Sequence, residues 1–247
     1  MDSLVELSGI GKSYGSVVAL HPTDIAFARG KTAALIGPSG CGKSTLLRLI
    51  IRLLEPDAGT VHFNGDVVTP AGIQEFRRRV GYVIQDGGLF PHLTARQNVQ
   101  LMASHLGWPR EKMNSRVGEL AALTRFPEEA LDRYPLELSG GQRQRISLMR
   151  ALMLSPELLL LDEPLGALDP LVRAALQKDL KEIFQRLRQT AILVTHDLAE
   201  AAYLGDEIVL MNAGRIVQRG NLADLRERPS DPFVSEFINA QRALTVV

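Results

Sequence analysis

A glycine-rich stretch at residues 37–45, GPSGCGKST, has the residue types and spacing of a phosphate-binding loop. It fits the pattern G-x-x-x-x-G-K-[ST], in which glycines let successive backbone N–H groups point at phosphate oxygens. The helix that follows adds the positive end of its dipole, the lysine supplies a full charge, and the serine hydroxyl can ligate Mg²⁺. We therefore expect a nucleotide-phosphate site made of Gly37, Pro38, Ser39, Gly40, Cys41, Gly42, Lys43, Ser44 and Thr45.

A carboxylate pair at the end of an apolar run provides a metal ligand and a base. The run LLLLDEP at 158–164 predicts a buried strand ending in Asp162, which can hold Mg²⁺. Glu163 then lies at the carboxyl end of the strand, where an α/β sheet binds its ligand. A carboxylate there can orient or deprotonate an attacking water. An acidic turn alone is weakly informative, but together with the glycine-rich loop it favours nucleotide chemistry.

Two further polar residues follow apolar runs and are expected at the same edge of the sheet. His196 ends the predicted strand AILVTH, and Gln85 ends VGYVIQ. A lone histidine more often has a structural role, but its strand is expected beside the other two, which favours a position near the γ-phosphate. The Gln85 amide is expected to sense Mg²⁺ or water and to report to the segment that follows it.

A second glycine pair lies in LSGGQRQR at 138–145, at the start of a predicted helix. Ser139 can cap this helix, while Gly140 and Gly141 leave backbone N–H groups open to an anion. The simpler interpretation is a well-capped helix without a ligand.

The elements that position these residues alternate between apolar strands and amphipathic helices. Strands are expected at 3–7, 22–28, 32–36, 60–63, 80–85, 158–164 and 191–196, with a hairpin over 207–220, and helices at 43–54, 72–79, 138–154, 170–187, 197–204, 221–227 and 232–239. Residues 86–136 show helical patterns only: a capping box at 94–97 begins one helix, and others are expected near 110–124 and 127–133. This pattern predicts a mostly parallel sheet covered on both faces, interrupted by a helical lobe.

Composition narrows the class of protein. The 247 residues include 28 Lys+Arg and 28 Asp+Glu, and this zero net charge disfavours a nucleic-acid binder. The single cysteine, Cys41, excludes an internal disulfide; it can fill space in the loop, be a thiol whose alkylation would block nucleotide binding, or do both. We see no secretory signal and no apolar run of membrane-spanning length, so we expect a soluble chain that reaches a membrane only through a partner.

The string LSGGQ gives the second glycine pair more weight, because the motifs together resemble the ATP-binding subunits of ATP-binding-cassette (ABC) transporters. They follow that family's order along nearly the whole chain: Tyr14, GPSGCGKST, Gln85, LSGGQ, LLLLDEP, Leu165–Asp169 and His196. The resemblance implies an α/β fold with an ABC-type P-loop NTPase core, an N-terminal antiparallel β portion and an inserted α-helical subdomain. It implies one ABC domain, with a nucleotide-binding core at 1–85 and 137–225, a helical subdomain at 86–136 and a short helical tail at 226–247.

The resemblance also implies a role for each motif within one chain. Tyr14 stacks on adenine, and residues 37–45 bind the phosphates of ATP. Mg²⁺ and water are served by Ser44, Asp162 and Gln85. Glu163 is the general base, and His196 contacts the γ-phosphate.

A second copy of the chain completes the site that the resemblance implies. Ser139, Gly140, Gly141 and Gln142 bind the γ-phosphate of ATP held by the other subunit, and Asp169 crosses the interface. Because one chain has one P-loop and one LSGGQ, two chains must pair head to tail in a homodimer. ATP closes this dimer and hydrolysis reopens it. Gly166 stands where many relatives have serine, and we expect little effect from that difference.

The helical lobe is expected to pass this motion to integral-membrane permease subunits. Leu89 and Phe90 lie beside glycines in a predicted loop. They are either core residues or, as we prefer, part of a groove for a cytoplasmic helix of the permease.

The phrases VIQDGGLFPHLTARQNV and LDEPLGALDP look most like importer subunits, especially those for osmoprotectants such as glycine betaine or choline. Such a complex includes a periplasmic or extracellular substrate-binding protein and holds its ATPase at the cytoplasmic face of the bacterial inner membrane. An amino-acid importer, an export or lipid-transport ATPase, and a non-transport ABC ATPase are the alternatives. Some relatives continue into a C-terminal regulatory domain, which we do not expect in a chain ending at Val247.

Overall fold

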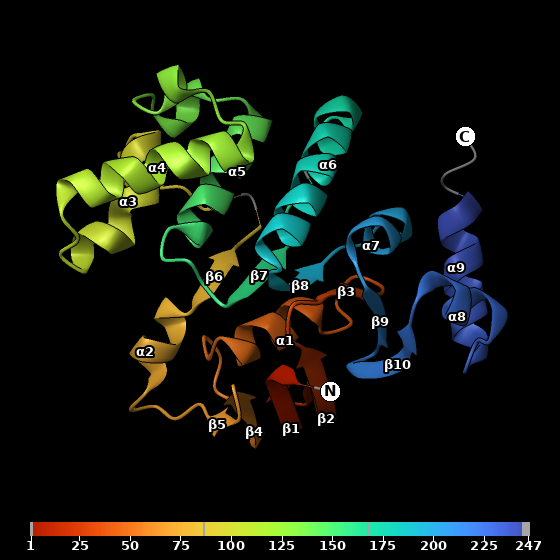
Figure 1. Cartoon of the computed structure of the whole chain (residues 1–247). Helices are drawn as coiled ribbons and strands as arrows, with labels where there is room; N and C mark the ends of the chain where they lie inside the picture. The colour runs from red at the N-terminus through yellow and green to blue at the C-terminus, as the bar shows by residue number, and fades with distance from the viewer. Residues whose placement is uncertain (1, 86, 167, 244–247) are drawn as a thin grey trace.

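A six-stranded sheet forms the centre of the molecule (Figure 1). The computed structural model describes residues 2–85, 87–166 and 168–243. The strand order is β10-β9-β3-β8-β7-β6, and neighbouring strands are parallel except β9 and β10. The strands are β3 (Thr32–Ile36), β6 (Val80–Val83), β7 (Leu158–Asp162), β8 (Thr190–Val194), β9 (Glu207–Asn212) and β10 (Arg215–Gly220). Every residue of β3, β7 and β8 is buried, which explains their apolar runs.

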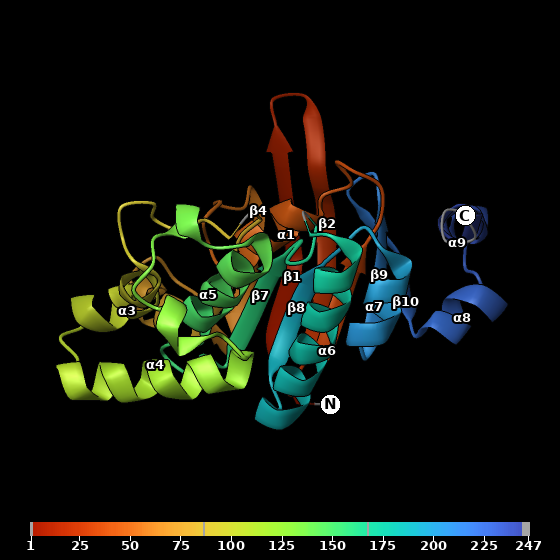
Figure 2. The same cartoon turned by 90° about the horizontal axis from the view of Figure 1, so that it is seen from above.

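The N-terminal part of the chain forms a second, antiparallel sheet of order β2-β1-β4-β5. Its strands are β1 (Ser3–Tyr14), β2 (Val17–Ala28), β4 (Ala58–Phe63) and β5 (Asp66–Val67). The strands expected at 3–7 and 22–28 are longer, because they pair with each other as far as a tight turn at Gly15, whose φ of 59° favours glycine. Figure 2 shows this hairpin extending beyond the rest of the fold.

Helices cover both faces of the central sheet. Helix α1 (Lys43–Ile50) lies between the two sheets, and α2 (Ile73–Arg78) precedes β6 (Figure 1). The opposite face carries α5 (Gly140–Leu152), α6 (Pro170–Leu187) and α7 (Leu198–Leu204). Helix α1 is shorter than the expected 43–54, because the chain leaves the helix at Arg52, which has a left-handed φ of 57°.

The helical lobe between β6 and α5 packs on α5. Its helices are α3 (Ala95–His105) and α4 (Arg110–Thr124), and the capping box predicted at Thr94 and Gln97 is present. Val99, Leu120 and Ile146 are completely buried where α3, α4 and α5 meet. The lobe is therefore attached to the core through the helix that LSGGQ begins.

The helix expected at 127–133 is wrong. The chain forms one 3-10 turn at Glu128–Ala130 and a second at Pro135–Glu137. The carbonyl groups of Leu131 and Arg133 accept from the backbone N–H groups of Arg96 and Ala95 instead of continuing a helix. The unpaired N–H groups at the start of α3 are satisfied in this way.

Two short helices end the described chain. Helix α8 (Leu222–Glu227) and α9 (Pro232–Ala243) pack against the central sheet through Leu225, Val234 and Ile238.

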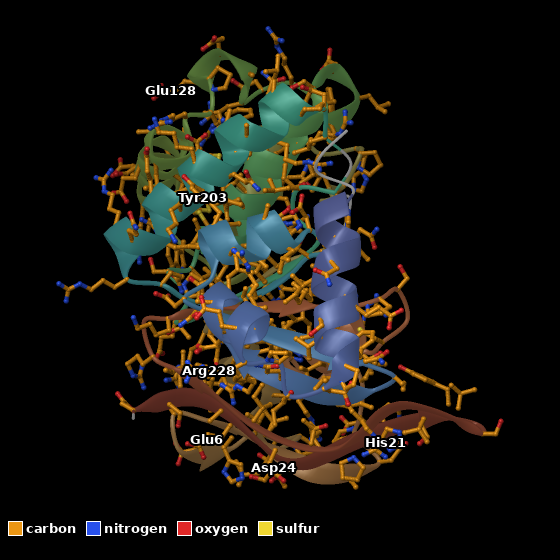
Figure 3. All side chains as sticks on the ribbon, turned by 90° about the vertical axis from the view of Figure 1, so that its right-hand side faces the viewer. Glu6, His21, Asp24, Glu128, Tyr203 and Arg228 are labelled. Carbon is orange, nitrogen blue, oxygen red and sulfur yellow. The ribbon has the colours of Figure 1, made fainter. Side chains whose placement is uncertain are left out.

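In the view from the side of α8 and α9, Glu128 in the lobe lies at one end of the molecule, and Glu6 and Asp24 in the N-terminal sheet lie at the other (Figure 3). Over the described ranges, no helix is both long and apolar enough to cross a membrane.

Three predicted features lie outside the described residues. They are Asp86, where the inserted lobe is expected to begin, Ala167 within the predicted turn Leu165–Asp169, and residues 244–247 of the predicted tail.

Candidate functional site

The glycine-rich loop between β3 and α1 is held in shape by close backbone approaches. Gly37 has a φ of 146° and Gly42 a φ of 105°, values that residues other than glycine rarely adopt. A Cβ at Gly37 would lie 2.1 Å from the Met211 carbonyl oxygen, and one at Gly42 would lie 2.5 Å from that of Ala19. Glycine is therefore required at both positions, and the neighbouring strands hold the loop in one shape.

Lys43 and the first turn of α1 supply positive charge to this loop. The Lys43 side chain is buried, and its ammonium donates to the carbonyl oxygens of Gly37 at 2.8 Å and Pro38 at 3.0 Å. Among the described residues, no side chain caps the N–H groups at the start of α1, which follows Gly42. An ammonium and free helix N–H groups within one loop form an anion site suited to phosphate.

The loop is joined to the carboxylate at the end of β7. Ser44 donates a hydrogen bond of 2.8 Å to Asp162 Oδ1, and the Tyr82 hydroxyl donates to Oδ2 at 3.4 Å. Asp162 is only 2% exposed. Burial, with the nearby Asp162 charge, raises the pKa of Tyr82, so its hydroxyl keeps the proton that it donates. A hydroxyl and a carboxylate oxygen in contact are ligands of the type that Mg²⁺ prefers.

Glu163 and His196 lie side by side beyond the ends of β7 and β8. His196 Nδ1 is 3.7 Å from Glu163 Oε2. Glu163 has a left-handed φ of 49°, and its N–H donates to the Val194 carbonyl at 3.0 Å. The chain therefore turns sharply at Glu163, directly after the Asp162 that Ser44 contacts.

Gln85, Glu163 and His196 line one cleft of about 360 Å³. Neither Gln85 nor His196 ends a strand as expected: β6 ends at Val83 and β8 at Val194. Each polar side chain is instead carried by the loop two residues further on. The three residues are brought together as predicted, but by loops rather than by the sheet itself.

The LSGGQ stretch begins α5 with a reciprocal capping box. Ser139 Oγ accepts from the Gln142 N–H at 3.2 Å, and the Gln142 side chain accepts from the Ser139 N–H at 2.9 Å. The predicted cap is thus present. Gly140 lines the same cleft as Glu163, whereas a Cβ at Gly141 would lie 2.6 Å from Val172 Cγ1.

The two remaining predicted residues lie at the ends of elements. Tyr14 is half exposed at the end of β1 beside the hairpin turn, and the Lys12 ammonium lies 5.8 Å from the centre of its ring. Asp169 caps α6 by accepting from the Val172 N–H at 3.1 Å. A ring exposed in this way can stack on a base, and a cap residue at a helix start can also face a partner chain.

Prediction from the sequence missed three polar residues near the site: Tyr82, which bonds to Asp162, and Arg173 and Glu200, which line a small cavity with Glu163. Glu200 lies on α7, is 4% exposed, and lines a small cavity together with Glu163 and His196. Burial raises the pKa of its carboxyl group to about 7. Its position in the sequence could have indicated that Glu200 lies near the site. Glu200 follows His196 by four residues and is in the first turn of α7, which begins just after His196.

The raised pKa of Glu200 predicts a pH-dependent stability. Asp197 and Glu163 raise this pKa further and Arg173 lowers it, but burial is the largest cause. Since the pKa of about 7 in the folded chain exceeds the ordinary carboxyl pKa of 4.5, the contribution of Glu200 to stability is fully present below pH 4.5 and is lost as pH rises through 7. The loss amounts to about 3 kcal/mol. Urea unfolding between pH 5 and 8 should show this slope in the wild type and a flatter one in Glu200→Gln; equal slopes would contradict it.

Cys41 is expected to react slowly with alkylating agents until nucleotide-free protein is brought to high pH. Burial raises the pKa of its thiol, and the Lys43 ammonium, 3.7 Å away, opposes this only in part. Reaction with N-ethylmaleimide, followed by mass spectrometry, should accelerate from pH 7 to pH 10 and be suppressed by ATP. Cys41→Ser is the unreactive control. Fast labelling at pH 7 that ATP does not change would contradict the placement of Cys41 inside the phosphate loop.

A phosphate-binding loop bonded to a buried aspartate, in a sheet that a helical lobe interrupts, is the architecture of ATP-binding cassettes. Residues 20–166 match the model of the ABC transporter family, so the chain belongs to this family. The expected family and fold class are thereby confirmed.

Curated relatives agree with the osmoprotectant resemblance. The chain is 44% identical over 242 residues to the choline transport ATP-binding protein OpuBA of Bacillus subtilis, covering 98% of this chain and 64% of that protein. It is 42% identical over 234 residues to the glycine betaine uptake system ATP-binding protein YehX of Escherichia coli, covering 95% and 76%. The chain thus spans less than two thirds of the length of the Bacillus relative.

Solved structures share the fold over most of the chain. The dimeric post-hydrolysis state of the ATP-binding cassette MJ0796, bound to ADP and Pi, superposes with a TM-score of 0.80 at 30% identity, covering 88% of this chain and 98% of that one. CbiO1 from Clostridium perfringens, part of the ABC transporter complex CbiONQ, gives 0.83 at 27% identity, covering 100% and 96%.

Proposed function

We propose that this chain is the ATP-hydrolysing subunit of an ABC importer. The observation that carries the proposal is the cleft in which Gln85, Glu163 and His196 meet beside the bonded pair Ser44 and Asp162. Ser44 of the phosphate loop is hydrogen-bonded to Asp162, and the candidate base Glu163 is the next residue along the chain. That combination has a use in phosphoryl transfer to water and little use in a protein that only binds nucleotide.

Within this site each residue has one task. Tyr14 stacks on adenine, and the loop 37–45 holds the phosphates through backbone N–H groups and Lys43. Ser44, Asp162 and Gln85 would hold Mg²⁺, which would neutralise phosphate charge. Their oxygen donors suit this ion, since Ser44 and Asp162 are already in contact at 2.8 Å.

Glu163 removes a proton from the attacking water, and His196 contacts the γ-phosphate. The carboxylate and the imidazole are 3.7 Å apart, so both can reach one group in the cleft. Glu163 is held at the edge of the sheet by the hydrogen bond from its backbone to Val194. The base is thereby placed by the backbone before any ligand arrives.

A second copy of the chain completes the site in this proposal. Ser139, Gly140, Gly141 and Gln142 begin α5, where the capping box engages the N–H groups of Ser139 and Gln142 and leaves those of Gly140 and Gly141 for the γ-phosphate of ATP held by the partner, while Asp169 faces the interface. The dimeric structures of MJ0796 support such an arrangement. ATP then closes a two-fold homodimer, and hydrolysis reopens it.

A permease subunit is the proposed partner of an apolar groove beside the lobe. The groove has a volume of about 450 Å³ and is lined by Tyr82, Ile84, Phe90, Met102 and Leu154, among others. Phe90, Met102 and Ile84 are exposed there, whereas Leu89 packs against the core of the lobe. An apolar groove of this size suits one face of a helix from the permease.

The groove predicts a selective loss of permease binding. Phe90→Glu would bury a charge in the proposed interface and should lower recovery of the permease by about tenfold or more, with the ATPase activity of the isolated chain retained. The matched control is Leu187→Glu, since Leu187 is 41% exposed and Phe90 43%. Affinity purification with quantitative mass spectrometry measures the difference. Equal recovery with both variants would contradict the proposed surface.

The proposed substrate is an osmoprotectant with a quaternary amine, such as glycine betaine or choline. The names of the Bacillus and Escherichia relatives support it. A substrate-binding protein outside the membrane would select this molecule, and the present chain would act at the cytoplasmic face of the bacterial inner membrane. In the same proposal the chain is one ABC domain with its core at 1–85 and 137–225, its helical subdomain at 86–136 and its tail at 226–247.

A tagged chain purified from detergent-solubilised native membranes tests this function. Recovery of a multi-span permease and a substrate-binding protein is the expected result, and the latter should bind betaine or choline in preference to amino acids. Recovery of ribosomal or DNA-repair proteins without a permease would overturn transport. A binding protein selective for amino acids would overturn the osmoprotectant assignment and leave import in place.

A further inference from the structure

A buried carboxyl group lies behind the candidate base without a role in the proposed chemistry. Glu200 is 4% exposed and lines a small cavity shared with Glu163, Thr195 and His196. Among the described residues, its Oε1 atom has no hydrogen-bond partner. Burying a carboxyl group with an unpaired oxygen costs folding free energy, so its position calls for an explanation.

Glu200 lies beside the loop that carries His196. The Thr195 side chain and the Glu200 carboxyl group line this cavity together. Thr195 Oγ1 also accepts from the Asp197 N–H at 3.1 Å, so this hydrogen bond joins the residues on both sides of His196. The loop that carries His196 therefore lies against the α7 carboxyl group.

Arg173 enters the same cavity from the other side. Its Nη2 lies 3.4 Å from the carbonyl oxygens of Gly166 and Leu168, in the turn that follows Glu163. Within the described part of the chain, its buried Nε atom also lacks a hydrogen-bond partner. A guanidinium and a carboxyl group with spare hydrogen-bonding capacity thus line one cavity, one holding the loop after Glu163 and the other lying beside the loop that carries His196.

We propose that Glu200 and Arg173 are positioning residues, which hold the loops of His196 and Glu163 in register for hydrolysis. The pair works from behind the cleft and does not touch ATP. It couples the turn that ends at Asp169, on the proposed dimer interface, to the imidazole on the γ-phosphate. This inference rests on the ATP hydrolysis proposed above, and it assigns the two residues an effect on the chemical step rather than on nucleotide binding.

The variants Glu200→Ala and Glu200→Gln separate positioning from folding. Glu200→Ala removes the carboxyl group beside Thr195 and should lower kcat by about 10- to 100-fold while KM for ATP stays within about twofold, since misplaced catalytic groups slow chemistry by this order. Glu200→Gln keeps the size and an acceptor oxygen and should restore kcat to within about threefold. Glu207→Gln is the matched control, because Glu207 pairs with Arg219.

Arg173→Met tests the other half of the pair. It should lower kcat to a similar extent, and Arg173→Met combined with Glu200→Ala should be no slower than the worse single variant, because both act through one cavity. Losses that multiply in the double variant would overturn the joint role. Urea unfolding of each variant confirms that the chain assayed is folded.

Histidine NMR of the nucleotide-free chain reads the orientation directly. The ring resonances of His196 should shift in Glu200→Ala and stay in place in Glu207→Gln. An unchanged kcat in Glu200→Ala, a loss confined to KM, or unshifted His196 resonances would each overturn the proposal. If the wild-type chain showed no ATPase activity, the proposed function would fail, whereas the NMR result would still decide whether Glu200 positions His196.

Discussion

Replacing Glu163 with glutamine is expected to abolish ATP turnover while trapping an ATP-bound dimer. The amide cannot accept the proton of the attacking water, and loss of a general base lowers kcat by about 100- to 10,000-fold. Glutamine has nearly the same shape, and the left-handed φ of 49° and the bond to Val194 involve only the backbone. ATP binding is therefore retained, and the closed dimer persists because hydrolysis no longer reopens it.

Steady-state phosphate release and sedimentation with ATP measure the two parts of this result. Glu119→Gln serves as the control, since Glu119 lies on α4 and pairs with Arg116 on the surface of the lobe. Wild-type turnover in Glu163→Gln would refute the assignment of the base. Loss of turnover with no ATP-dependent dimer would refute the proposal that ATP closes the dimer.

The variant Lys43→Ala is expected to weaken ATP binding itself, by about tenfold to 100-fold. The ammonium is the full positive charge inside the loop, and charge-assisted hydrogen bonds contribute about 1.5–3 kcal/mol each. It also donates to the carbonyls of Gly37 and Pro38, so part of the loss comes from a less ordered loop. Fluorescence titration with a labelled ATP analogue gives the change in Kd.

The control for this variant is Lys31→Ala, which removes an exposed lysine paired with Asp206 at the far end of β3. Urea unfolding should show that both variants fold. An ATP affinity equal to that of the wild type in Lys43→Ala would contradict the placement of the β- and γ-phosphates at the loop.

The parts that could be predicted from sequence are those whose physics is local. The loop 37–45 is one contiguous segment, so its glycines, lysine and serine predict a phosphate site without any knowledge of tertiary contacts. The capping boxes at Thr94 and Ser139 are equally local, and both are present. Buried parallel strands are apolar throughout, so the alternation of strands and helices was also visible.

The parts that could not be predicted depend on contacts between distant segments. Tyr82 contacts Asp162 although the two residues are 80 positions apart in the sequence. Nothing in the residue type of either one predicts this contact. The region 127–133 has helical composition, but its carbonyl groups satisfy the start of α3 instead. Glu200 carried no local signal of burial, because its cavity is formed by α6, α7 and two loops that meet only in the folded chain.

In the proposed mechanism, each ATP site takes its phosphate loop from one chain and its LSGGQ from the other. Two variants of the chain, both carrying Glu163→Gln, test this arrangement. The first also carries Lys43→Ala. The second also carries Ser139→Asp, which keeps a good helix cap but places a negative charge where the γ-phosphate would bind. In the mixture, one intact site combines the loop of the second chain with the LSGGQ of the first. Sedimentation with ATP should therefore show monomers for each chain alone and a dimer for the mixture. A dimer from the Ser139→Asp chain alone, or none from the mixture, would contradict a shared site.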